Sequence, residues 1–155
     1  PPRAWLDALL APVPTEWASV TSPFGRFEVA FPYPPRTVGH ASETAPELEV
    51  LTLDVDTLSL AAVVQTAPAA VSAAQQAAFL DRAISRMGEL GRIVRREDAS
   101  LDGRPATRLV LATGFGRLDA ILAMTDRQLV TLTASPSLAE RFFRSARWVP
   151  ETDGP

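Results

Sequence analysis

The sequence predicts an α+β domain, in which an antiparallel sheet of about six to eight strands packs against one long helix and a C-terminal helix. Four strand-like segments between residues 92 and 134 follow one another through links of two to four residues. Such short links join antiparallel strands, because a parallel pair needs a crossover of a dozen or more residues. Apolar residues also recur at helical spacing in two segments, one over 72–90 and a shorter one that begins near 135.

The first two strands are predicted on either side of a tight turn. Trp17–Thr21 is the first strand, and in the turn Ser22–Gly25 the proline fixes φ while the glycine permits a positive φ. Arg26–Phe31 alternates between apolar and polar residues, which is typical of a half-buried antiparallel strand. The side predicted to be buried consists of Phe27, Val29 and Phe31. Pro32 and the prolines that follow it end this strand.

Three further strands are predicted before the main helix. A short strand spans 37–41, and residues 48–55 alternate again. In that second strand, Leu48, Val50 and Thr52 lie opposite Leu51 and Leu53. Segment 58–65 is more continuously apolar, as expected for a central strand that is covered on both faces.

The main helix is expected over 72–90. Ser72 and Gln75 have the spacing of a capping box, and Gly91 suits the position after a helix. The apolar stripe consists of residues three or four apart: Phe79, Leu80, Ala83, Ile84, Met87 and Leu90. This stripe is wide enough to cover the face of a sheet.

The C-terminal part is predicted to be a meander followed by the final helix. Its strands are Arg92–Leu101, Arg104–Ala112, Arg117–Met124 and Gln128–Ala134. The pair Asp102 and Gly103 is a strong hairpin signal, because both residues tolerate the positive φ of a type I′ turn. In the final helix, Ser137 and Glu140 have the spacing of a second capping box.

These elements are expected to form one domain over residues 15–149. An N-terminal arm, residues 1–14, precedes it, and residues 3–10 have the spacing of a short helix that Pro12 ends. This arm either packs on the core or binds a partner. Residues 150–155 are expected to form a frayed tail.

The composition fits a single globular domain. The chain has 155 residues, of which 46% are hydrophobic and 21% are charged. The net charge of −3 gives no electrostatic reason to bind nucleic acid or an anionic membrane. All 15 basic residues are arginine, which the codon usage of a GC-rich genome explains; contacts to carboxylates or phosphates are the alternative. No apolar run approaches the roughly 20 residues of a transmembrane segment.

The sequence offers few residues for catalysis or metal binding. Cysteine is absent and His40 is the only histidine, so no metal site is expected. There is no nucleophile elbow of the Gly-x-Ser-x-Gly type, and Gly114–Gly116 lacks the third glycine of a dinucleotide loop. Asp54 and Asp56 are expected in a solvated turn, with calcium binding or acid–base chemistry as the alternative. We therefore expect neither a cofactor nor an enzyme.

A group of arginines has two interpretations. Arg95, Arg96 and Arg108 lie on neighbouring predicted strands. They are expected to pair across the strands with acidic residues, namely Glu97, Asp98 and Asp119. An anion-binding site built from the three arginines is the alternative.

Four motifs follow one another in a distinctive order. They are Ser-Pro-x-Gly-Arg-Phe-x-Val-x-Phe-Pro at Ser22–Pro32, a long helix at Ser72–Leu90, Leu-x-Gly-x-Pro at Leu101–Pro105 and Phe-Phe-Arg-Ser at Phe142–Ser145. In this order they resemble bacterial PsbP-like α/β/α domains over roughly residues 15–149. The chain departs from that pattern at Ala146, where an aromatic residue is usual, and in its N-terminal arm.

The resemblance implies an accessory or assembly factor of a larger complex, and it carries no catalytic residues over to this chain. Because such domains are often exported or lipid-anchored, it also implies a place outside the cytoplasm or in the cell envelope, with a targeting segment that lies outside the printed sequence. We therefore expect a non-catalytic accessory or structural subunit that binds protein partners. The candidate interface residues lie near chain ends and turns: Trp5, Leu9, Tyr33, Phe115 and Trp148.

A small-ligand carrier is the alternative function. Such a protein would hold an apolar or anionic molecule between the sheet and the main helix. The pocket would measure roughly several hundred Å³ and be lined by Phe79, Ile84 and Leu111. An enzyme would instead need a cleft with convergent ionisable groups, which the sequence does not reveal.

Overall fold

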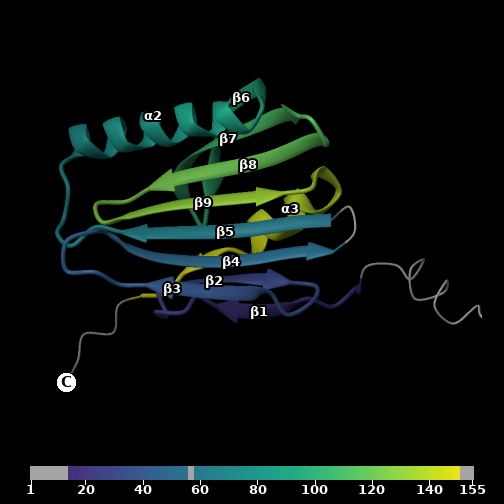
Figure 1. Ribbon diagram of the computed structural model, residues 1–155, viewed down its shortest axis with the longest axis horizontal. Coiled ribbons are helices and arrows are strands. Elements are labelled where there is room, and N and C mark those ends of the chain that lie inside the picture. Colours follow the sequence, from purple (N-terminus) through teal and green to yellow (C-terminus); the bar gives the residue numbers. More distant parts are fainter. Residues whose placement is uncertain (1–13, 56–57, 151–155) are drawn as a thin grey trace, which may run out of the picture.

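A seven-stranded antiparallel sheet forms the centre of the computed structural model, which describes residues 14–55 and 58–150 (Figure 1). The strand order is β3-β4-β5-β9-β8-β7-β6. The strands are β3 (Arg36–His40), β4 (Glu47–Val55), β5 (Leu58–Thr66), β6 (Arg92–Leu101), β7 (Arg104–Thr113), β8 (Gly116–Met124) and β9 (Gln128–Ala134). With a helix on each face, this arrangement confirms the predicted α+β fold.

Turn chemistry that is local in the sequence fixes the register of the meander. At the β6–β7 turn, Asp102 has φ 49° and Gly103 has φ 76°, the two left-handed residues that a type I′ turn requires. At the β7–β8 turn, the hydroxyl of Thr113 donates a 2.7 Å hydrogen bond to the carbonyl of Gly116 and accepts one from the Phe115 N–H. Both turns lie where the sequence predicts them.

A second sheet of three strands lies on one face of the large sheet. Its order is β1-β2-β10, with β1 at Ala18–Thr21, β2 at Phe27–Phe31 and β10 at Arg147–Trp148. The alternation of β2 is as predicted, since Phe27, Val29 and Phe31 are fully buried. The separation of β1 and β2 into their own sheet was not predicted, because strand order depends on contacts distant in the sequence.

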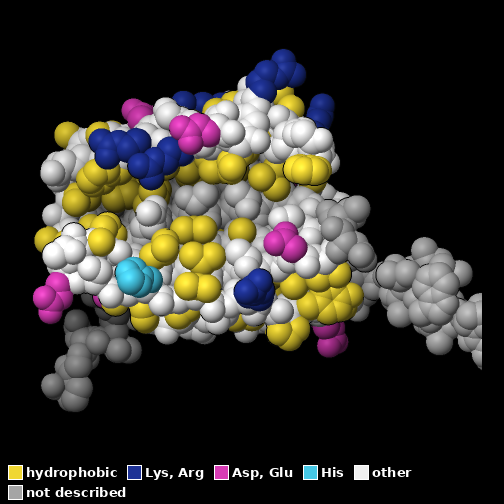
Figure 2. Space-filling view, in the orientation of Figure 1, with side chains coloured by type: hydrophobic (Ala, Val, Ile, Leu, Met, Phe, Trp, Pro, Cys, Tyr) yellow, Lys and Arg dark blue, Asp and Glu magenta, His cyan; other side chains and the backbone are white. Residues whose placement is uncertain are grey.

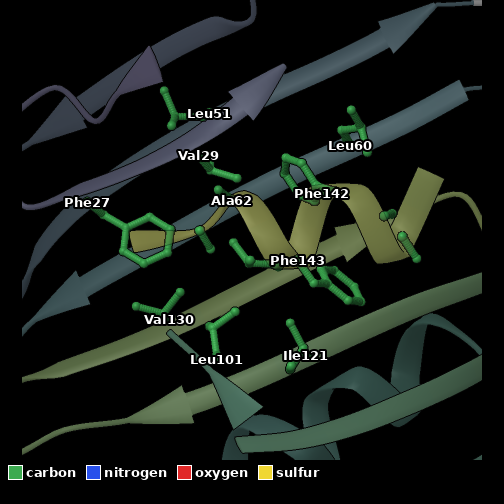
Figure 3. Close-up of a cluster of buried hydrophobic side chains, with 14 of the residues drawn as sticks. Phe27, Val29, Leu51, Leu60, Ala62, Leu101, Ile121, Val130, Phe142 and Phe143 are labelled. Carbon is green, nitrogen blue, oxygen red and sulfur yellow. The ribbon is translucent and has the colours of Figure 1, made fainter. Parts of the chain in front are cut away.

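The main core lies between the large sheet, β2 and the helix α3 (Pro136–Ser145) (Figure 3). The rings of Phe31 and Phe142 meet edge to face with their centroids 5.2 Å apart. Ala146, where PsbP-like domains usually have an aromatic residue, is fully buried at the end of α3.

The long helix α2 (Ala73–Leu90) packs on the opposite face of the large sheet (Figure 1). Its predicted capping box is confirmed: Ser72 Oγ accepts from the Gln75 N–H, and Gln75 Oε1 accepts from the Ser72 N–H. A second core joins Ile84 and Met87 to side chains of β7 and β8. The helix contacts β6, β7 and β8. It therefore covers one half of this face and leaves the half formed by β9, β5, β4 and β3 open.

Gly91 follows α2, but the reason for a glycine there differs from the one expected. Its backbone is extended, with φ 177°, so no left-handed conformation is required. A Cβ atom at this position would lie 2.5 Å from the carbonyl oxygen of Ala112 on β7. Glycine is needed because α2 ends in close approach to the sheet.

Two local predictions are wrong. The second capping box does not form, because α3 begins at Pro136 with Ser135 as its N-cap, and the carboxylate of Glu140 accepts instead from Arg108. The hydroxyl of Ser135 accepts a 2.8 Å hydrogen bond from the Ser59 N–H at the start of β5. Likewise, β5 is buried on one face only, and Val63 on its other face is half-buried. The helix α2 packs mainly on β6, β7 and β8 instead.

The predicted N-terminal arm lies outside the described residues except for Pro14, and the predicted tail does so except for Pro150. Asp56 lies outside them as well.

Candidate binding groove

The candidate interface residues predicted from the sequence do not gather on one surface. Trp5 and Leu9 lie outside the described residues. Tyr33 and Phe115 are exposed, but Tyr33 precedes the edge strand β3, whereas Phe115 joins β7 to β8 near the opposite edge of the sheet. Trp148 is half-buried, with its ring edge-on to Phe27 at 5.4 Å.

A groove of about 650 Å³ lies where α2 stops short of covering the sheet. Its floor is formed by residues of three neighbouring strands, β5, β9 and β8, that face α2. The register places Val63 of β5 opposite Thr131 of β9, and Gln65 of β5 opposite Leu129 of β9. Leu129 in turn lies opposite Met124 of β8. Its wall is the side of α2 that carries Phe79, Ala83 and Met87. Figure 2 shows apolar side chains along this hollow beneath the helix.

The segment that connects β5 to α2 closes one end of the groove. Residues 67–71 line it there, and they are small or apolar. Two backbone hydrogen bonds of 2.7 Å hold the segment against the β8–β9 turn, from the Ala67 N–H to the Arg127 carbonyl and from the Val71 N–H to the Asp126 carbonyl. The guanidinium of Arg127 donates back to the carbonyl of Ala67 at 3.1 and 3.3 Å. This end is therefore preformed.

The charged residues that line the groove are all basic. Arg82, Arg86 and Arg127 line it, and among the described lining residues there is no aspartate or glutamate. Arg82 lies over the ring of Phe79, 5.8 Å from its centroid. In Figure 2 basic side chains gather along the edge where α2 overhangs the apolar hollow.

The position of this groove matches the pocket that the sequence predicts for a ligand carrier, whereas its lining matches only in part. Phe79 lines the groove, as expected. Ile84 and Leu111 do not, because both are buried in the second core between α2 and the sheet. The sequence could have indicated the correct helix face, since Phe79, Ala83 and Arg86 recur at spacings of three and four.

The three arginines proposed as an alternative anion site do not converge. In the β6–β7 register, Arg95 faces Val110 and Arg96 faces Leu109, so the two lie on opposite faces of the sheet. Arg95 pairs with Glu97 on its own strand rather than across strands. Of the predicted cross-strand pairs, only that of Arg108 with Asp119, at 3.0 Å, is among the ion pairs of the described residues.

Arg108 is instead the centre of a small ion cluster beside α3. It binds the carboxylates of Asp119 and Glu140, and its guanidinium lies 5.4 Å from the centroid of the Phe143 ring. Burial opposes the charge of Arg108, but hydrogen bonds to Glu140 and Asp119 raise its pKa. The same hydrogen bond from Arg108, with the attraction of its charge, lowers the pKa of Glu140. Because two carboxylates occupy this guanidinium, the cluster is structural.

Metal-binding groups are scattered across the described part of the chain. Nowhere in it do three histidine, aspartate or glutamate side chains come together as metal ligands would. His40 is exposed at the end of β3, and Asp54 is exposed on β4. Neither described helix is long and apolar enough to cross a membrane.

The groove is thus the one feature that brings together a cavity, an apolar surface and charges of one sign within residues 14–55 and 58–150. No protein-family model matches this chain, and no curated protein matches it either.

Proposed function

We propose that this protein is a non-catalytic binding protein that carries an apolar small molecule in the groove between α2 and the strands β5 and β9. The observation that carries the proposal is the groove of about 650 Å³ with its predominantly apolar lining. Ligand sites of small molecules fall in this range, are mostly apolar and contain a few polar groups that fix orientation. The hydrogen-bonded closed end lowers the cost of ordering the site on binding.

The ionisable groups of the groove support binding rather than catalysis. The charged lining residues are Arg82, Arg86 and Arg127, and a guanidinium group does not act as a general base. Thr131 has the only hydroxyl among the described lining residues, and no such base lies in the groove to activate it. In keeping with the resemblance to PsbP-like domains, we place this activity outside the cytoplasm or in the cell envelope.

Binding of a neutral fluorescent probe tests this proposal. N-phenylnaphthylamine, which becomes fluorescent in apolar surroundings, should bind the purified protein with a stoichiometry of one. Thr131→Phe should abolish binding, because the ring would fill the floor of the groove. Thr133→Phe is the matched control, since Thr133 lies on the same strand and the same face but outside the lining. A probe that does not bind, or that binds both variants equally, would refute the proposal.

A second candidate function, that of an accessory subunit that binds a protein partner, is favoured by exposed apolar residues at one end of the molecule. Leu90 is 60% exposed, Val94 is 43% exposed and Phe115 is fully exposed. The close approach of Gly91 to Ala112 brings the α2–β6 corner next to the β7–β8 hairpin. Exposed aromatic and aliphatic side chains of this kind often serve as interface residues.

This second candidate is tested by photo-crosslinking from position 115. A benzoylphenylalanine introduced at this position should crosslink one protein in stoichiometric yield in the native cells. Purification of the tagged protein should recover the same partner, Phe115→Asp should lose it, and Phe24→Asp, which changes another exposed phenylalanine, should retain it. Diffuse crosslinks, or a partner retained by Phe115→Asp, would argue against an accessory subunit that binds through this end.

A further inference from the structure

We propose that the molecule carried in the groove is an acidic amphiphile, whose apolar chain lies on the sheet floor while its carboxylate or phosphate binds Arg82 and Arg86. This inference rests on the function proposed above and adds the chemical class of the ligand.

The charges that line the groove have one sign. Three arginines line the groove without an acidic residue among the described lining, although the whole chain carries a net charge of −3. The acidic residues of α2, Asp81 and Glu89, are exposed and do not line the groove. Guanidinium groups bind carboxylates and phosphates through paired hydrogen bonds, which become stronger beside an apolar surface.

Two of these guanidinium groups lack an ionic partner within the described part of the chain. Neither Arg82 nor Arg86 forms an ion pair with any described residue. Arg108, by contrast, is occupied by two carboxylates. Arg82 and Arg86 lie one turn apart on the same side of α2, with their Cβ atoms about 6 Å apart, so that both side chains can reach one anionic group.

Arg127 has a different role, because its guanidinium is bound to the carbonyl of Ala67. Its side chain is thereby held at the closed end. There its charge adds to the positive potential of the groove while the guanidinium keeps its hydrogen bonds to the Ala67 carbonyl. The head group is therefore assigned to Arg82 and Arg86.

The shape of the groove suits a small amphiphile better than a helix of a protein partner. The wall extends from Gln75 to Met87, about 18 Å along the helix axis, which suits an extended alkyl chain. Residues 67–71 close one end of the groove, so a chain with a free end fits it, whereas a longer partner helix would meet this segment. The volume also lies in the small-molecule range.

Two probes that differ by one acidic group test this inference. Anilinonaphthalene sulfonate carries a sulfonate that the neutral N-phenylnaphthylamine lacks, while both have the same aromatic body. The sulfonate should bind the wild-type protein at least tenfold more tightly than the neutral probe, and high salt should reduce this preference. The double variant Arg82→Gln/Arg86→Gln should lose this preference and bind the two probes with similar affinity. Arg92→Gln, which changes an exposed arginine outside the groove, should behave like the wild type.

The outcomes separate this inference from the proposed function. If the wild type binds the two probes equally, or if the double variant keeps the preference for the sulfonate, the acidic head group is refuted while the apolar groove stands. If neither probe binds, both proposals fail. Glutamine is a good helix former, and equal melting temperatures of the variants would exclude unfolding as the cause. Competition by palmitate and by lysophosphatidate then separates a carboxylate from a phosphate head group, and competition by hexadecanol alone would overturn the inference.

Discussion

The hydroxyl of Ser22 donates a 2.7 Å hydrogen bond to Oε1 of Glu49, a residue 27 positions later on β4. Both side chains are buried, and Glu49 is only 1% exposed. The same carboxylate oxygen accepts a second 2.7 Å bond from the Phe24 N–H. One buried carboxylate thus fastens the β1–β2 turn, and with it the small sheet, to the large one.

Replacing Glu49 by alanine should cost about 3 kcal/mol of unfolding free energy. The change leaves the buried Ser22 hydroxyl without its acceptor, which costs about 1–3 kcal/mol, and it also removes the acceptor of the part-buried Phe24 N–H. Equilibrium unfolding in urea measures this difference.

The control for this variant is Glu47→Gln. Glu47 lies on the same face of β4 as Glu49 and pairs with Arg26, but both side chains are partly exposed, so the loss should stay below about 1 kcal/mol. Equal losses for the two variants would show that the carboxylate of Glu49 is not what holds the turn.

Gly91→Ala should destabilise the protein by about 1–3 kcal/mol. The added Cβ would lie 2.5 Å from the backbone oxygen of Ala112, so α2 or β7 must shift, as in an overpacked core. Thermal unfolding measures the effect.

Gly88→Ala gives the opposite expectation on the same helix. Nothing lies within 4 Å of a Cβ at Gly88, so alanine should stabilise α2 by about 0.5–1 kcal/mol through its higher helix propensity. If Gly91→Ala also stabilised the protein, the close approach of the helix end to β7 would not be the reason for a glycine at position 91.

The parts of the fold that could be predicted from the sequence are those set by neighbouring residues. The φ angles of Asp102 and Gly103, the capping box of Ser72 with Gln75 and the alternation of Phe27–Phe31 are all local properties, and the structure contains each of them. Ser137 was predicted wrongly as a cap, although a local signal was present: Pro136 is favoured at the first position of a helix and marks Ser135 as the N-cap.

The groove could be predicted only in part, because it is not set by neighbouring residues. A helix with an apolar stripe must pack on a sheet, but which strands it covers depends on the strand order, and that order places β5 beside β9 rather than beside β6. The burial of Glu49 could not be predicted either. Its neighbours Leu48 and Val50 indicate a strand, but they do not show that the β1–β2 turn covers the face on which Glu49 lies.

The ion pair between Arg108 and Glu140 should make stability depend on pH in the acid range. The hydrogen bond from Arg108 lowers the pKa of Glu140 below its value in the unfolded chain, which is about 4.3. Its contribution is therefore fully present above that value and is lost as the pH falls through the folded-state pKa. Since Glu140 is largely exposed, Glu140→Gln should cost less than about 1 kcal/mol at neutral pH and nothing at low pH.

Urea unfolding of the wild type and Glu140→Gln between neutral pH and pH about 3 measures this convergence. Glu89→Gln is the control, because Glu89 forms no ion pair with a described residue and should show no such trend. A difference between wild type and Glu140→Gln that stays constant down to acid pH would contradict the assignment to this carboxylate.

Arg127 should control the closed end of the groove through its contact with the Ala67 carbonyl. Arg127→Ala removes the guanidinium that donates to this carbonyl at 3.1 and 3.3 Å, so the segment 67–71 should open more often. Hydrogen exchange of the Ala67 and Val71 amides, which donate to the β8–β9 turn, should become faster.

The neutral probe separates this effect from the loss of a positive charge. Its affinity should fall about fivefold in Arg127→Ala, since a disordered groove end must be ordered again on binding. Arg36→Ala is the control, because Arg36 is exposed on β3 and lies outside the lining. Faster exchange with unchanged probe affinity would mean that ligand binding does not use the closed end. Unchanged exchange would mean that the backbone hydrogen bonds of Ala67 and Val71 hold the segment without the guanidinium.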